Sequence, residues 1–139
     1  RWVALAQSLA PEYRCILLGG PEERSRSERM VENAAGALET LTGQTSLIES
    51  AALIQQSDLV IGVDTGLTHL AMATERPTLA LFGSTRPYWE TGHAHAEILY
   101  VPEPCSPCHR RPTCGGTFTC MRRHGTEDVL RAVARISRA

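Results

Sequence analysis

The sequence predicts an α/β domain in which helices flank a Rossmann-like parallel sheet. Short apolar runs without strict polar alternation, typical of strands buried on both faces, lie at residues 15–18, 59–63, 78–82 and 97–101. Segments with helical spacing of apolar residues separate these runs, so strands and helices alternate. Because ligands bind at the carboxyl ends of parallel strands, we expect one crevice to gather three loops: residues 19–20, 64–66 and 83–84.

Each predicted helix has a start signal or an apolar face. Ser46 and Glu49, three residues apart, match a capping box. Pro21 follows Gly20 at a position that favours the first turn of a helix, and apolar residues then recur at helical spacing as far as Leu38. Helices are therefore expected at five places: residues 2–10, after Gly20, from Ser46, over 66–75 and from about Thr126.

The composition excludes some classes of function. The formal net charge is -1, so no global attraction to nucleic acid is expected, although all 14 basic residues are arginine. No secretory signal is recognised, and no apolar run approaches the roughly 20 residues that span a bilayer. Five cysteines without a secretory context favour reduced thiols or a metal over disulfides. A soluble, cytoplasmic protein is therefore expected.

The most informative feature is a predicted strand that ends at Asp64 and is followed at once by a helix start. The backbone N–H groups of Gly66, Leu67 and Thr68 would point out of the helix N-terminus, where the helix dipole favours an anion. Thr65 and Thr68 add hydroxyl donors. This pattern predicts a phosphorylated ligand such as a nucleotide or a sugar phosphate. The structural alternative makes Thr65 an ordinary N-cap and Asp64 a complement to the dipole.

Two strings carry a resemblance to a known family: VDTGLTHLA at residues 63–71 and RPTLALFGST at residues 76–85. They resemble the donor-binding region of the lipopolysaccharide heptosyltransferases, inverting GT-B glycosyltransferases of family 9. The similarity runs from Cys15 to the last helix. It implies a single nucleotide-sugar-binding domain over 1–139, the C-terminal half of a two-domain enzyme. The first residue, Arg1 rather than Met, agrees with a piece of a longer protein.

The resemblance implies roles for the residues of the first string. Asp64 would accept hydrogen bonds from sugar hydroxyls of an ADP-heptose donor, and His69 would lie beside the diphosphate. Because a carboxylate facing phosphate would repel it, we expect Asp64 to turn toward the sugar or toward Thr68. The phosphates would meet four residues: Thr65, Gly66, Leu67 and Thr68.

Two further segments match the family more loosely. Gly20 and Glu23 fall where relatives grip the ribose hydroxyls with an acid, and Glu23 aligns best. Residues Thr45, Ser46 and Leu47 fall where backbone groups meet adenine. The structural alternative makes Glu23 a first-turn acid and Ser46 a helix cap.

The resemblance also implies the partners of the reaction. The general base of the family is an Asp of the N-terminal domain, so no catalytic base is expected in this chain, and it should bind donor without transferring sugar. No cofactor is required. The expected partners are the N-terminal domain of the same protein and a lipid A-core acceptor, and not nucleic acid. The enzyme would lie at the cytoplasmic face of the inner membrane.

Residues 84–125 are rich in Cys, Pro and Gly and long for a connection without structure, which indicates a functional or cross-linked segment. The spacing C-x2-C-x5-C-x5-C could hold zinc, although the second spacing exceeds that of a zinc knuckle, so packing thiols or a disulfide formed in vitro are the favoured alternative. The cysteines are Cys105, Cys108, Cys114 and Cys120.

Other polar residues of the same region are open to two interpretations. His109 and His124 lie near the cysteines, whereas His93 and His95 are expected to be loop residues. Four arginines could face an anionic acceptor or be solvated: Arg110, Arg111, Arg122 and Arg123.

Alternatives to the leading hypothesis are a related glycosyltransferase with another nucleotide sugar and a noncatalytic, metal-stabilised binding module. A dehydrogenase is disfavoured because Gly19-Gly20-Pro21 does not match the G-x-G-x-x-G fingerprint. Within the family, the cysteine-bearing tail favours the second heptosyltransferase type.

Overall fold

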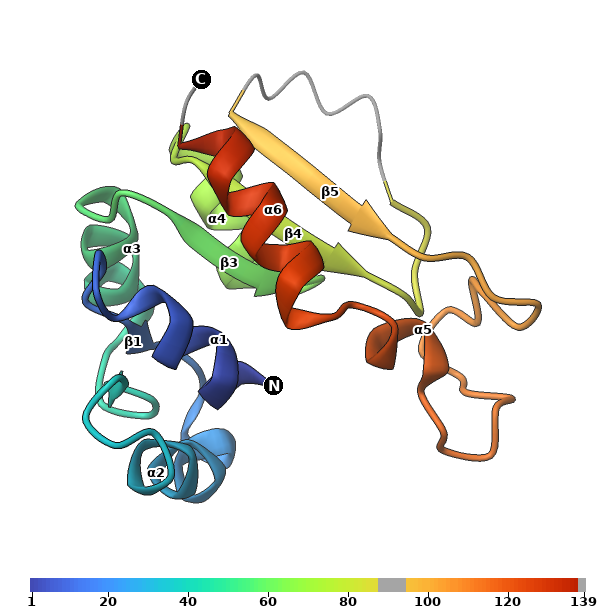
Figure 1. Cartoon of the computed structure of the whole chain (residues 1–139), viewed down its shortest axis with the longest axis horizontal. Coiled ribbons are helices and arrows are strands. Elements are labelled where there is room, and N and C mark those ends of the chain that lie inside the picture. The colour runs from blue at the N-terminus through green and yellow to red at the C-terminus, as the bar shows by residue number, and fades with distance from the viewer. Residues whose placement is uncertain (88–94, 138–139) are drawn as a thin grey trace. The chain divides into compact units, whose positions relative to one another are not determined.

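The structure is a computed structural model that describes residues 1–87 and 95–137 (Figure 1). Contacts within the chain divide it into two compact units, Arg1–Ala52 and Leu53–Ala139. The helix α3 (Leu47–Gln55) contains the boundary between them. None of the described helices is long and apolar enough to cross a membrane.

The first unit begins with α1 (Trp2–Leu9) and contains a two-stranded parallel sheet. The strand β1 (Ile16–Leu17) pairs with β2 (Glu39–Thr40), and Ile16 lies opposite Glu39. Between the strands come a 3-10 turn, η1 (Pro21–Glu23), and α2 (Arg24–Glu32). The core of this unit consists of small and apolar side chains from α1 and from the segment after α2: Ala6, Ala34 and Leu38.

The helical segment predicted as far as Leu38 is wrong in its second part. The helix α2 ends at Glu32, and the left-handed backbone of Ala35 (φ 51°) and Gly36 (φ 86°) prevents its continuation. Ala34 and Leu38 are still buried, because the chain turns back over the same core. The helical spacing of these apolar residues therefore reflects their burial and not a helix. The strand β2 was not predicted.

The second unit is built on a three-stranded parallel sheet in the order β3-β4-β5. The strands are β3 (Val60–Val63), β4 (Thr78–Phe82) and β5 (Ala96–Tyr100). All five residues of the central strand β4 are buried, as its unbroken apolar pattern predicts. The predicted strands agree with these bounds to within one residue.

Helices cover both faces of this sheet. Figure 1 shows α6 (Thr126–Ile136) crossing in front of β4, with α4 (Gly66–Ala73) behind it. The buried side of α6 contains Val129 and Val133, and that of α4 contains Met72, which packs with Phe82. A short helix, α5 (Thr119–Arg122), contacts β4. The predicted α/β architecture with a parallel sheet is confirmed.

Candidate functional site

The junction between β3 and α4 has the predicted form. Thr65 is the N-cap residue of α4, with extended backbone (φ -138°, ψ 165°), and its side chain makes no capping hydrogen bond. The Thr65 hydroxyl lies 3.4 Å from that of Thr68 instead. The first-turn N–H groups are therefore not used by the Thr65 side chain, which the structural alternative required.

The structure corrects the expected role of the Thr68 hydroxyl as a donor to the ligand. Its hydroxyl donates to the carbonyl of Val63 at 2.6 Å, and the residue is almost fully buried. A hydroxyl has a single hydrogen to donate, so this group is not available as a donor to a ligand. Thr68 ties the end of β3 to the first turn of α4, and its contribution to an anion site is limited to its backbone N–H.

Gly62 permits this close packing of strand and helix. A Cβ atom at Gly62 would lie 2.1 Å from the Thr68 Oγ1, a separation that Cβ atoms do not adopt. The absence of a side chain at Gly62 therefore allows the Thr68 hydroxyl to reach the Val63 carbonyl. The shape of the junction depends on a glycine in the strand before it.

Asp64 is held between two basic side chains. Its Oδ1 accepts a hydrogen bond from His69 Nε2 at 2.9 Å, and its Oδ2 accepts one from Arg110 Nη2 at 3.0 Å. The same Arg110 nitrogen donates to the Asp64 main-chain carbonyl at 3.2 Å. The carboxylate is thus directed to His69 and Arg110 and not to Thr68, because the Thr68 hydroxyl is engaged with Val63. Only 13% of the Asp64 side chain is exposed.

Sequence reasoning did not assign Arg110 to this site. The residue follows Asp64 by 46 positions and belongs to residues 84–125, the cysteine-rich segment. His109 and Arg110 both adopt left-handed backbone conformations (φ 50° and 64°), and the His109 N–H donates to the Ser84 carbonyl at 2.8 Å. Two consecutive non-glycine residues of this kind are uncommon, and they direct Arg110 toward Asp64.

The cysteine-rich segment is attached to the end of β4 by hydrogen bonds to three consecutive carbonyls. The Phe82 carbonyl accepts from His124 Nε2 at 2.8 Å, so that nitrogen carries the proton. The Gly83 carbonyl accepts from the Ser106 hydroxyl, and the Ser84 carbonyl accepts from the His109 N–H. The segment 84–125 is therefore ordered over its described part by main-chain contacts. Its residues 88–94, with His93, lie outside the described residues.

The carboxyl end of β4 and α5 also approach each other closely. A Cβ atom at Gly83 would lie 2.6 Å from Met121 Sδ and 2.9 Å from Cys120 Sγ. His95, by contrast, precedes β5 at the opposite end of the sheet, and its carbonyl accepts from the Thr78 N–H. His95 lies in the turn before β5, in agreement with its predicted place in a loop.

All five cysteines are free thiols. Hydrogen bonds from the Phe118 backbone and from the Thr117 side chain lower the pKa of Cys114, whereas burial raises the pKa of Cys120. In the ranges 1–87 and 95–137, no group of three or more His, Cys, Asp or Glu side chains is arranged to hold a metal ion.

The remaining candidate residues belong to the first unit, and two of them act as helix caps. Glu23 Oε2 accepts a hydrogen bond from the Gly20 N–H at 3.2 Å. Ser46 and Glu49 form the predicted capping box, in which each side chain accepts from the other residue's N–H at 3.3 and 2.8 Å. These are the roles that the structural alternative gives to Glu23 and Ser46. A donor-binding role for them stays a prediction.

Thr45 and Leu47 differ in their surroundings. The Thr45 hydroxyl lies 2.9 Å from the Ser50 hydroxyl, whereas the Leu47 side chain is 70% exposed. The predicted contact of this segment with adenine is made by backbone groups, and it stays a prediction.

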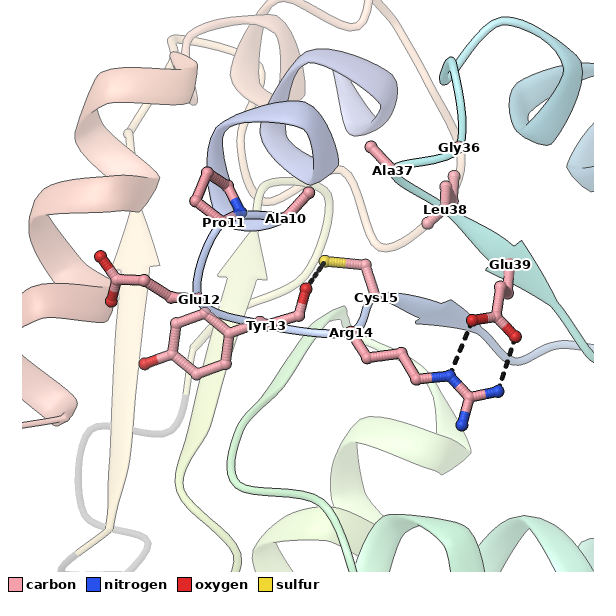
Figure 2. A pocket seen from close by; sticks show the side chains of 10 residues that line it. All are labelled: Ala10, Pro11, Glu12, Tyr13, Arg14, Cys15, Gly36, Ala37, Leu38 and Glu39. Atoms are coloured by element: carbon pink, nitrogen blue, oxygen red, sulfur yellow. Dashed lines mark hydrogen bonds and ion pairs between the residues drawn. The ribbon is translucent and has the colours of Figure 1, made fainter.

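A cavity of about 310 Å³ lies elsewhere in the first unit (Figure 2). It is lined by residues 10–15 and 36–39 and includes none of the candidate residues. Figure 2 shows Arg14 and Glu39 paired across two hydrogen bonds, each 2.7 Å long. This pair raises the pKa of Arg14 and lowers that of Glu39, so both side chains stay charged and their charges offset each other.

A parallel sheet with helices on both faces, and a polar junction at the carboxyl end of β3, define the chain as a Rossmann-like α/β protein. The model of glycosyltransferase family 9 (heptosyltransferase) matches residues 1–117. The chain belongs to this family, as its two strings predict.

Two curated relatives illustrate the similarity. Lipopolysaccharide heptosyltransferase 1 of Pseudomonas aeruginosa is 34% identical over 119 residues, which cover 81% of this chain and 32% of the relative. Lipooligosaccharide heptosyltransferase 2 of Haemophilus influenzae is 31% identical over 93 residues, covering 63% of this chain and 27% of the relative. The chain thus spans between about a quarter and a third of the length of these two relatives.

Solved structures show the same fold. The E. coli ADP-heptose lipopolysaccharide heptosyltransferase II gives a TM-score of 0.79 at 22% identity, over 98% of this chain and 40% of that one. An E. coli heptosyltransferase solved with ADP gives 0.75 at 25% identity, over 97% and 38%. Another structure, solved with ADP-2-deoxy-2-fluoro heptose, gives 0.72 at 26% identity, over 96% and 36%.

Proposed function

We propose that this chain is the donor-binding, C-terminal part of an inverting glycosyltransferase that transfers heptose from ADP-heptose to the lipopolysaccharide inner core. The observation that carries the proposal is the β3–α4 junction, where the N-cap side chain leaves the first-turn N–H groups unused and Asp64 is fixed beside them. The E. coli relatives solved with ADP and with an ADP-heptose analogue support the choice of ligand.

The geometry suits a leaving group that gains negative charge. The N–H groups of Gly66, Leu67 and Thr68 lie at the positive end of the α4 dipole, which favours a diphosphate there. These donors belong to the backbone of a helix and need no reorganisation as the bond to ADP breaks. The carboxylate of Asp64 would accept from sugar hydroxyls in exchange for its His69 contact, while Arg110 stays in place.

The other partners follow from the family. The general base that deprotonates the acceptor hydroxyl would belong to an N-terminal domain, and the acceptor would be a lipid A-core intermediate at the cytoplasmic face of the inner membrane. The chain alone would then bind donor without transferring heptose. The cysteine-bearing tail favours the second heptosyltransferase type, while the matched relatives include types 1, 2 and 3.

Calorimetric titration of the chain with ADP, ADP-heptose and UDP tests this proposal. We expect ADP-heptose and ADP to bind more tightly than UDP, and Asp64→Ala to weaken ADP-heptose more than ADP because only ADP-heptose carries the heptose. Asp58→Ala is the matched control, since it removes a carboxylate that precedes β3 and lies outside the junction.

Other outcomes would favour the alternatives. Preference for UDP would indicate a related glycosyltransferase that uses another nucleotide sugar. A folded chain that binds no nucleotide but retains about one zinc ion after dialysis would indicate a noncatalytic, metal-stabilised module.

A further inference from the structure

Arg110 has a position that the donor-binding residues of the β3–α4 junction do not explain by themselves. One nitrogen of its guanidinium, Nη2, donates both to the Asp64 carboxylate at 3.0 Å and to the Asp64 carbonyl at 3.2 Å. That carbonyl belongs to the residue directly before the N-cap Thr65. The guanidinium is therefore fixed within one peptide unit of the start of α4.

The rest of this guanidinium is open to a ligand. Arginine has five N–H donors, and the two on Nη2 are used by Asp64. Within residues 1–87 and 95–137, Nε and Nη1 of Arg110 make no hydrogen bond, and 68% of the side chain is exposed. The two nitrogens provide three N–H donors in a planar arrangement that matches an oxyanion such as phosphate.

The backbone around Arg110 is built to hold it there. The left-handed conformations of His109 and Arg110 cost conformational energy, and the bond from the His109 N–H to the Ser84 carbonyl fixes the preceding peptide. The neighbouring Arg111 has a side chain without any such ion pair in the described part of the chain. The loop thus directs one particular arginine of its pair to the junction.

The pairing of Arg110 with Asp64 compensates the negative charge at the junction. The Asp64 carboxylate, beside the expected diphosphate, would oppose the approach of a polyanion if it were uncompensated. The Arg110 guanidinium neutralises that carboxylate through Nη2 and leaves its other face positive. An anion at the N-terminus of α4 would then meet backbone N–H groups on one side and a cation on the other.

We propose that Arg110 is a donor-binding residue that contacts the diphosphate of the nucleotide sugar through Nε and Nη1 while Nη2 stays on Asp64. This inference rests on the proposed function and adds to it a cation supplied by the cysteine-rich segment. It gives that segment a role: its contacts with β4 place a positive charge at a site formed by β3 and α4. The segment serves the donor and not only the acceptor.

The test compares ADP with adenosine, which lacks the phosphates, by titration of the 139-residue chain. Arg110→Ala is expected to weaken ADP binding about ten-fold, the effect of one lost charge-assisted hydrogen bond, and to change adenosine binding by less than about two-fold. Arg110→Lys should fall between them, because an ammonium keeps the charge but not the planar pair of donors. Arg111→Ala is the matched control and should bind ADP as the unmodified chain does.

A second background separates direct contact from an effect through Asp64. In an Asp64→Asn chain, Arg110→Ala should still weaken ADP if the guanidinium touches phosphate. Loss of the Arg110 effect in that background would show that the arginine only orients Asp64, and would overturn the proposal. Circular dichroism and the urea midpoint of each variant establish that it is folded.

ADP binding by the unmodified chain and by Arg110→Ala distinguishes failure of the proposed function from failure of this inference. If the unmodified chain does not bind ADP, the proposed function and this inference are both wrong. If it binds ADP and Arg110→Ala binds equally well, only the inference is wrong.

Discussion

The contact between Gly62 and Thr68 allows a quantitative test of the junction that positions Asp64. In Gly62→Ala, the new Cβ would lie 2.1 Å from Thr68 Oγ1, so the hydroxyl must leave the Val63 carbonyl. Overpacking of a buried site costs about 1–3 kcal/mol, and loss of one hydrogen bond adds about 1 kcal/mol. Alanine recovers about 0.5–1 kcal/mol over glycine in a strand. We expect a net loss of about 2 kcal/mol.

The same substitution should be almost neutral once the Thr68 hydroxyl is absent. In a Thr68→Ala chain, the nearest remaining atom to the new Cβ is the Cβ of residue 68 at 3.3 Å, which a small shift relieves. Thr68→Ala by itself should cost about 2 kcal/mol through the lost hydrogen bond and methyl group. The two substitutions should therefore show a coupling free energy of about 2 kcal/mol.

Urea unfolding followed by circular dichroism measures all four members of this cycle. Thr68→Val is the matched control, because it keeps a γ atom in place of the hydroxyl, and Gly62→Ala should remain costly beside it. Additivity of the two alanine substitutions within about 0.5 kcal/mol would show that the new Cβ and the Thr68 hydroxyl do not clash. The Gly62 contact would then not determine the shape of the junction.

Two further predictions concern the helix cap of α3 and the thiols. Ser46→Ala should destabilise the chain by about 1 kcal/mol in urea unfolding, because the Glu49 N–H loses its acceptor. An unchanged midpoint would contradict the cap. The lowered pKa of Cys114 places more of it in the thiolate form at a given pH, so its alkylation rate should rise at lower pH than that of Cys120, whose pKa is raised. Mass spectrometry of partly alkylated chain gives the order in which the thiols react. Labelling of Cys120 before Cys114 would contradict the predicted order.

The parts of the fold that follow from local pattern were predictable. The strand at 78–82 was predicted with its observed bounds, because a strand buried on both faces has a continuous apolar sequence. The capping box of Ser46 and Glu49 was predicted because both partners lie within one helical turn. The two-residue strand β2 was not, since Glu39 and Thr40 have neither apolar pattern nor length.

The junction between β3 and α4 was predictable in its local structure and not in its side-chain contacts. The string from Asp64 to His69 contains the N-cap, the helix start and the carboxylate, all within six residues. The pairing of Asp64 with Arg110 joins positions 46 residues apart, and no local signal marks the arginine among its neighbours. The hydrogen bond from Thr68 to Val63 depends on the missing side chain of Gly62, which the pattern of the strand does not show.

The three carbonyls at the carboxyl end of β4, those of residues 82–84, limit which segments can be exchanged between family members. Because Ser106, His109 and His124 each reach a particular carbonyl among residues 82–84, their spacing is matched to the end of one strand. Changes of length are therefore best tolerated in the exposed turn at residues 111–117, where no such bond is made. A chimaera that receives residues 105–124 from a relative should receive residues 82–84 with them, so that the hydrogen-bond donors and their acceptors come from the same protein.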